Sequence, residues 1–155
     1  MLEVILKRFE HPDEIRTFEK GRFELVRLGG MTIGRATYEP GWKWSEHVGR
    51  AAGAKSCAVE HVGMVVSGRA TAAMDDGRVI EMKAGDIFYI APGHDSWVVG
   101  DKPYVSIHLM GADAYANAKK SACRAKNEAH FEDVQGQNAE KESVTAKKLQ
   151  VPVLL

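Results

Sequence analysis

The sequence of 155 residues predicts an all-β domain, either a sandwich or a barrel, followed by a helical C-terminal extension. Short segments rich in β-branched and aromatic residues recur through the first two-thirds of the chain, separated by closely spaced turn signals. Two of these turns, Gly29-Gly30 and Asp75-Asp76-Gly77, are typical of β-hairpins. After Gly111 the composition changes to alanine and lysine, which favours a solvated helix.

The elements divide the chain into three parts. Residues 1–20 predict a short strand at 2–6 and a helical turn that begins at Pro12-Asp13-Glu14, because acidic residues stabilise a helix N-terminus. Residues 112–155 predict a helix over 112–129, a polar tail, and an apolar end at 151–155 that docks on the barrel or on a second subunit. The glycine-rich stretch 49–55 predicts a loop. The barrel region, residues 21–111, predicts strands at 23–28, 31–38, 57–66, 70–74, 78–82, 88–90, 96–99 and 104–110.

Composition and charge exclude several classes of function. The net charge is +0 and the isoelectric point is about 7.0, so there is no electrostatic reason to expect nucleic acid or an anionic membrane as a partner. Cys57 and Cys123 are far apart and predict free thiols in a reducing compartment; Cys57, near His61, is expected to be a small buried hydrophobe. No signal-peptide pattern and no apolar run of about 18 residues is found, so we expect a cytoplasmic protein.

Three histidines fall where expected strands meet glycine-marked loops. The segment 85–95 predicts a turn, a buried strand and a Pro-Gly corner that presents a histidine and a carboxylate from a rigid support. Five residues separate Gly41 from His47, six separate His61 from Gly68, and His94 follows Pro92-Gly93 directly.

This arrangement resembles the cupin superfamily, and the segments that carry the resemblance are Gly41 to His47, His61 to Gly68, and Gly85 to Asp95. It implies a cupin jelly-roll β-barrel over about residues 30–110, in which family members hold a divalent metal with four ligands. It also implies a homodimer, because cupins commonly pair the edges of their sheets, which need cover. The family includes dioxygenases, isomerases and decarboxylases, so the fold alone does not choose a reaction.

The chain departs from the family pattern at most ligand positions. Gly49 stands where the family has its second histidine, His61 where it has glutamate, and Ser96 where it has the last histidine. The resemblance therefore implies a metal site of His47, His61 and His94, holding zinc, iron, manganese or nickel as a Lewis acid or an oxygen-activating centre. The alternatives are that these histidines are hydrogen-bonded polar residues at the barrel mouth, in a metal-free barrel that binds a small molecule or in a structural dimer.

Four further residues are candidates for a ligand pocket. Asp95 is placed to orient the second ring nitrogen of a metal-bound histidine. Trp44 and Trp97 would stack on a planar ligand or fill the core of the barrel, and core filling is common in small barrels. His108 lies on the opposite face of the last strand from its neighbours, and it lines the cavity if that face points inward.

Overall fold

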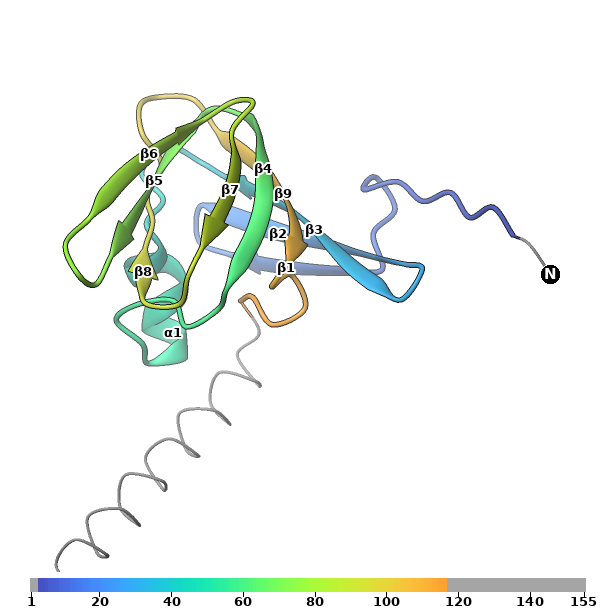
Figure 1. Ribbon diagram of the computed structural model, residues 1–155, viewed down its shortest axis with the longest axis horizontal. Helices are drawn as coiled ribbons and strands as arrows, with labels where there is room; N and C mark the ends of the chain where they lie inside the picture. The colour runs from blue at the N-terminus through green and yellow to red at the C-terminus, as the bar shows by residue number, and fades with distance from the viewer. Residues whose placement is uncertain (1–2, 117–155) are drawn as a thin grey trace, which may run out of the picture. The chain divides into compact units, whose positions relative to one another are not determined.

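A computed structural model describes residues 3–116 (Figure 1). Besides the strands it contains a π-helical turn, Ser45–Gly49, that continues into the short helix α1 (Arg50–Ala52). Among the described residues, no helix is long and apolar enough to cross a membrane. The strands are β1 (Glu14–Phe18), β2 (Gly21–Leu28), β3 (Met31–Tyr38), β4 (His61–Ser67), β5 (Arg69–Met74), β6 (Val79–Lys83), β7 (Ile87–Ile90), β8 (His94–Asp95) and β9 (Tyr104–Met110).

The strands form two antiparallel sheets, which confirms the all-β jelly roll. One sheet has six strands in the order β1-β2-β3-β9-β4-β7, and the other has three in the order β6-β5-β8. In Figure 1, β5, β6 and β8 lie to one side of the barrel and β1, β2, β3 and β9 to the other. Of the C-terminal extension, only a turn over 112–116 lies within the described residues; the expected helix to residue 129, the tail and the apolar end lie outside them.

The core lies between the two sheets. Phe23 and Tyr38 come from the six-stranded sheet, Ala72 comes from the three-stranded sheet, and all three belong to one cluster of buried side chains. Because successive side chains of a strand point to opposite faces, each strand contributes alternate residues to this core. In β9 the buried positions are Tyr104, Ser106 and His108, so this strand turns two polar side chains into the interior.

Both hairpins expected from glycine turns are present. Gly29 and Gly30 have φ angles of 58° and 80° and join the paired residues Leu28 and Met31 of β2 and β3. The segment Asp75-Asp76-Gly77 lies in the turn that joins β5 to β6.

The expectations for the N-terminal part were wrong. Glu14–Phe18 is strand β1, not a helical turn, and it pairs with β2 from Glu14 opposite Leu25 to Phe18 opposite Gly21. Alternation of half-buried and exposed residues along this segment fits a strand, and pairing with β2 outweighs the acidic helix-start signal. Within the expected strand at 2–6, the described residues form no strand, and Val4 and Leu6 are 89% exposed.

Three elements around the site also differ from the expectation. The segment 49–55 is partly helical, because the turn at Ser45–Gly49 continues into α1. Strand β4 begins at His61 instead of residue 57, and Cys57 instead forms an isolated bridge with His94. In 96–99 there is no continuous strand, only isolated bridges from Trp97 and Val98.

Candidate metal centre

Cys57, His61 and His94 converge inside the barrel. One potential ligand atom from each, the thiol sulfur or an imidazole nitrogen, lies within 4.8 Å of the other two. All three side chains are buried, with exposed fractions of 1%, 2% and 3%. Buried imidazole and thiol groups that share one small space are typical ligands of zinc and other transition metals.

Backbone hydrogen bonds fix Cys57 beside His94. The Cys57 amide donates to the His94 carbonyl at 2.7 Å, and the Gly93 amide donates to the Cys57 carbonyl at 2.8 Å. His61 enters from the first position of β4, where its register partner is Ile90 of β7. The ligand atoms are therefore held by strand pairing and not by a free loop.

The imidazole of His94 is oriented as a metal ligand would be. Its Nδ1 lies 2.7 Å from the Ala91 carbonyl oxygen, and a proton on Nδ1 leaves the lone pair of Nε2 free. The Cys57 sulfur lies 3.6 Å from Nε2 of His61. A tetrahedral zinc with Zn–S of about 2.3 Å and Zn–N of about 2.0–2.1 Å separates these two ligand types by about 3.6 Å, so the donor pair fits such an ion.

Burial keeps every group of the centre uncharged when no metal is bound. It lowers the pKa of His61 to about 2, with the nearby His108 and His94 adding to the effect. It also lowers the pKa of His108 to about 4 and that of His94 below its ordinary value. Burial raises the pKa of the Cys57 thiol to about 11. Neutral imidazoles offer free lone pairs, and the thiol must lose its proton to become a ligand.

His108 lies beside the three converging residues and is held by aromatic rings. Its ring is 5.2 Å from that of His61 and makes edge contacts with Phe23 at 5.3 Å and Phe88 at 5.5 Å between ring centroids. Its register partners in β3 and β4 are both glycines, Gly34 and Gly63. A side chain at either position would overlap one of the two phenyl rings, so the glycines make room for them.

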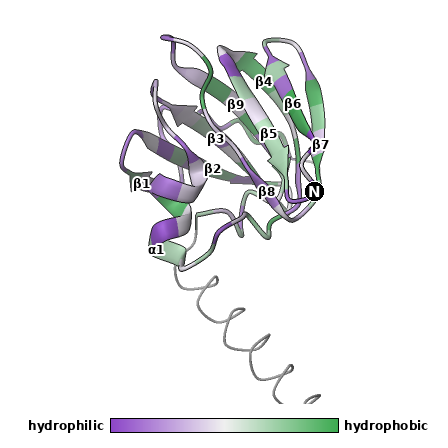
Figure 2. Ribbon diagram, turned by 90° about the vertical axis from the view of Figure 1, so that its left-hand side faces the viewer, coloured by the Kyte–Doolittle hydropathy of each residue, from purple (hydrophilic) through white to green (hydrophobic). Residues whose placement is uncertain are grey.

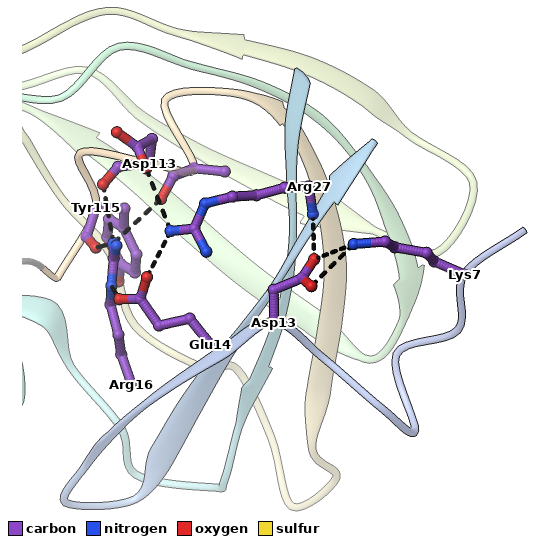
Figure 3. A network of polar contacts seen from close by, with 8 residues as sticks. Lys7, Asp13, Glu14, Arg16, Arg27, Asp113 and Tyr115 are labelled. Carbon is purple, nitrogen blue, oxygen red and sulfur yellow. Dashed lines mark hydrogen bonds and ion pairs between the residues drawn. The ribbon is translucent and has the colours of Figure 1, made fainter. Parts of the chain in front are cut away.

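Tyr115 closes the space next to His61 and His108. Its ring centroid is 5.2 Å from that of His61, and its hydroxyl is hydrogen-bonded to that of Tyr38 at 2.8 Å. Arg16 of β1 holds this segment in place, because its guanidinium donates to the backbone carbonyls of Ala112, Asp113 and Tyr115 (Figure 3). The buried core therefore continues past residue 111, where the sequence predicted the barrel to end.

The converging histidines border a small cavity of about 30 Å³, enough for one or two water-sized groups. Its walls are mainly aromatic, and both Trp42 and Trp44 contribute to them. Tyr38 stacks on Trp42 at 3.7 Å with an angle of 10° between the ring planes. His108 also lines the cavity, so the inward face of β9 carries this histidine.

Not every residue of the sequence-predicted site joins this group. The ring of His47 lies in the Ser45–Gly49 turn, where its Nδ1 is 3.0 Å from the amide nitrogen and 2.9 Å from the carbonyl oxygen of Lys43. Asp95 accepts hydrogen bonds from the amide and hydroxyl of Ser45 and from the amide of Ser96. Trp97 is half-buried, pairs with Lys43 and does not line the cavity. Of the predicted metal ligands, the structure brings together His61 and His94 but not His47.

The sequence analysis missed Cys57, Tyr115 and Trp42 as residues of the site. Cys57 precedes His61 by four positions, a spacing that in an extended segment gave no signal of a shared site. Tyr115 lies after the glycine taken as the end of the barrel, and its burial depends on Arg16, which is far away in sequence. The only sequence signal for the burial of Tyr115 is that it is a single aromatic residue in an alanine-rich segment.

Comparison with known proteins supports the fold. No protein-family model matches the chain, and no curated protein sequence is detectably similar. A protein of unknown function from Rhizobium leguminosarum is 18% identical, with a TM-score of 0.51 covering 70% of this chain and 97% of its own. A double-stranded β-helix protein from Klebsiella pneumoniae is 20% identical (TM-score 0.46, covering 75% and 94%). A cupin-like protein from Thermotoga maritima is 15% identical (TM-score 0.44, covering 71% and 82%). The two antiparallel sheets are arranged as a jelly roll, and the likeness to the Rhizobium leguminosarum protein, at 18% identity, concerns the fold alone.

Proposed function

We propose that this cupin-fold protein binds one divalent metal ion through Cys57, His61 and His94, and a small oxygen-bearing molecule beside it. The observation that carries the proposal is the approach of the three ligand atoms to within 4.8 Å of one another at buried positions. Three protein ligands leave room for a water or ligand oxygen, which is typical of catalytic zinc sites and not of structural ones. Such an ion supplies Lewis acidity, or oxygen activation if it is iron.

The donor set narrows the choice of metal. A thiolate with two imidazoles suits zinc, iron, nickel or copper, whereas manganese prefers oxygen ligands. Of the metals expected from the sequence, we therefore retain zinc, iron and nickel and set manganese aside. The protein's own contribution is to hold the imidazoles neutral and correctly rotated, as the Nδ1 contact of His94 with the Ala91 carbonyl does.

The first prediction tests the ligand set. Purified full-length chain, incubated with Zn²⁺ and desalted, should retain about one ion per chain by mass spectrometry. Cys57→Ser and His94→Gln should each weaken retention by at least about a hundredfold, since each removes one of three protein ligands. His47→Gln is the matched control and should retain the ion, because the His47 ring is bonded to Lys43. With Co²⁺ in place of zinc, a thiolate-to-metal absorption band should appear and be absent from Cys57→Ser.

The outcomes separate the alternatives. Loss of the ion in His47→Gln with retention in Cys57→Ser would favour the histidine set expected from the sequence. Wild-type protein that retains no metal, and whose thermal unfolding is unchanged by added metal, would support the metal-free binding barrel instead.

We also propose that the chain forms a homodimer through the outer face of β4 and β7. Met64, Ile87 and Tyr89 on this face are 42%, 79% and 63% exposed. They adjoin one another, because Met64 pairs with Ile87 and the neighbouring Val62 pairs with Tyr89. Figure 2 shows β4, β6 and β7 with much of their length in the colour of hydrophobic residues. Strand β7 is also at one edge of its sheet, where unpaired backbone groups favour pairing with a second chain.

The second prediction tests this surface by sedimentation at micromolar concentration. The wild type should sediment as a dimer, and Ile87→Lys should shift it to monomer because the variant places a charge at the edge of the contact. Ile15→Lys is the control, since Ile15 is 55% exposed on β1, the opposite edge strand. A monomeric wild type, or dissociation by Ile15→Lys alone, would contradict the proposed surface.

A further inference from the structure

Four buried nitrogen atoms around the cavity have no hydrogen-bond partner among the described residues. They are Nε1 of Trp42, Nε1 of Trp44, Nδ1 of His61 and Nδ1 of His108. The four side chains are 1%, 6%, 2% and 7% exposed, and all of them line the same cavity. Buried polar atoms in folded proteins are nearly always paired, so unpaired donors on two residues that line one cavity, Trp42 and Trp44, indicate a partner that the chain itself does not supply.

The two indole groups define the chemistry of that partner. An indole N–H donates a hydrogen bond and cannot accept one, so the groups missing opposite Trp42 and Trp44 are acceptors. Both residues make backbone hydrogen bonds to the segment 96–98: the Val98 amide donates to the Trp42 carbonyl at 3.0 Å, and the Trp44 amide donates to the Ser96 carbonyl at 2.8 Å. These bonds hold the backbone of both tryptophans in place.

The charge balance of the site determines the charge of the ligand. Among residues 3–116, those that line the cavity include no lysine, arginine, aspartate or glutamate. A divalent ion bound by the Cys57 thiolate and two neutral imidazoles leaves a net charge of one positive unit. In a site so deeply buried, a single negative charge on the ligand is needed to compensate it.

We propose that the ligand of this cavity is a small monocarboxylate, whose oxygens accept hydrogen bonds from the indoles of Trp42 and Trp44 while the metal supplies the compensating charge. This inference rests on the proposed metal centre. The volume of about 30 Å³ matches two water-sized groups, which is the size of the two carboxylate oxygens, so it limits the ligand to the smallest carboxylates, such as formate or acetate. The aromatic walls, with Tyr38 stacked on Trp42, suit an apolar substituent.

The third prediction uses acetate and its neutral isostere acetamide as probes of the zinc-loaded full-length protein, with binding followed by calorimetry. Acetate should bind at least about tenfold more tightly than acetamide. Trp42→Phe and Trp44→Phe each keep an aromatic ring and remove one N–H, so each should weaken acetate binding about tenfold, as expected for a hydrogen bond to a charged group. Trp97→Phe is the matched control and should not change it, because Trp97 does not line the cavity.

The failure of this inference is distinguishable from failure of the metal centre. Zinc content is measured on the same samples, and a wild type without zinc would overturn the proposed function itself. Zinc-loaded protein that binds acetate and acetamide equally, or binds neither, would overturn the monocarboxylate alone. So would an equal loss of acetate affinity in Trp97→Phe. If Trp42→Phe does not fold, Trp44→Phe and the wild-type preference for acetate still decide the question.

Discussion

Gly68→Ala should lower the free energy of unfolding by about 3 to 4 kcal/mol, one of the two largest effects expected for this protein. Gly68 lies at the corner where the chain passes from β4 of one sheet to β5 of the other, and its φ angle is 74°. A Cβ atom added there would lie 2.2 Å from the carbonyl oxygen of Pro103 and 2.8 Å from Cα of Tyr104. Both contacts are with backbone, so no side-chain rotation relieves them.

The control for this prediction is Gly77→Ala. Gly77 has a similar positive φ of 91°, but no atom lies within 4 Å of its would-be Cβ, so only the conformational cost of about 1 kcal/mol remains. Urea unfolding of both variants measures the difference. Equal destabilisation of the two variants would contradict the prediction. It would mean that the backbone at Gly68 can move away from Pro103 and Tyr104 at little cost in free energy.

Much of the barrel could be predicted because its signals are local. Two short glycine-containing turns, Gly29-Gly30 and Asp75-Asp76-Gly77, predict hairpins because glycine adopts the positive φ angles that such turns need. The apolar, β-branched and aromatic residues on either side of each turn predict the strands. The expectation of a helical turn in the N-terminal segment was wrong because it, too, was based on a local signal. Acidic residues near Pro12 are a local helix signal, and the pairing of Glu14–Phe18 with β2 depends on residues beyond any local window.

The cluster of Cys57, His61 and His94 was only half predictable from the sequence, because it depends on the direction of each side chain. His61 and His94 lie on strands, where register fixes the face to which each ring points. His47 lies in a helical turn instead, and its ring finds a partner four residues earlier at Lys43. Cys57 takes the place expected for His47 in the cluster, because a backbone bridge holds it beside His94. The spacing of the residues in the sequence does not predict this bridge. The glycines taken as motif markers were thus better guides to the fold than to the ligands.

The two unpaired indole N–H groups at the site lower the stability of the barrel. Trp44, expected either to stack on a ligand or to fill the core, is buried in the core together with Trp42, yet the N–H groups of both find no acceptor within the described residues. A barrel built only for stability would place phenylalanine there and avoid the cost of a buried, unpaired donor, which is about 1–3 kcal/mol each. The proposed carboxylate would remove this cost by accepting a hydrogen bond from each indole.

Acid should destabilise the metal-free protein through its buried histidines, at a pH above the range where carboxylates titrate. In the folded chain the pKa is about 2 for His61 and about 4 for His108, whereas in the unfolded chain both are near 6.5. The unfolded state thus binds more protons, so stability is complete above about pH 6.5 and falls as the pH drops below it. Each of these two histidines should lower the free energy of unfolding by about 1 kcal/mol between pH 8 and pH 5.5, and His94 acts in the same direction.

Replacing one of these histidines should make the free energy of unfolding depend less steeply on pH. His108→Phe places a phenyl ring among Phe23, Phe88 and Tyr115 and removes one group that gains a proton on unfolding. Urea unfolding between pH 8 and pH 5.5, with a chelator present, should then show about 1 kcal/mol less acid destabilisation than the wild type. His11→Phe, at an exposed position outside the barrel, should leave the slope as it is. If the stability of His108→Phe depends on pH as that of the wild type does, His108 is not held neutral by burial in the folded chain.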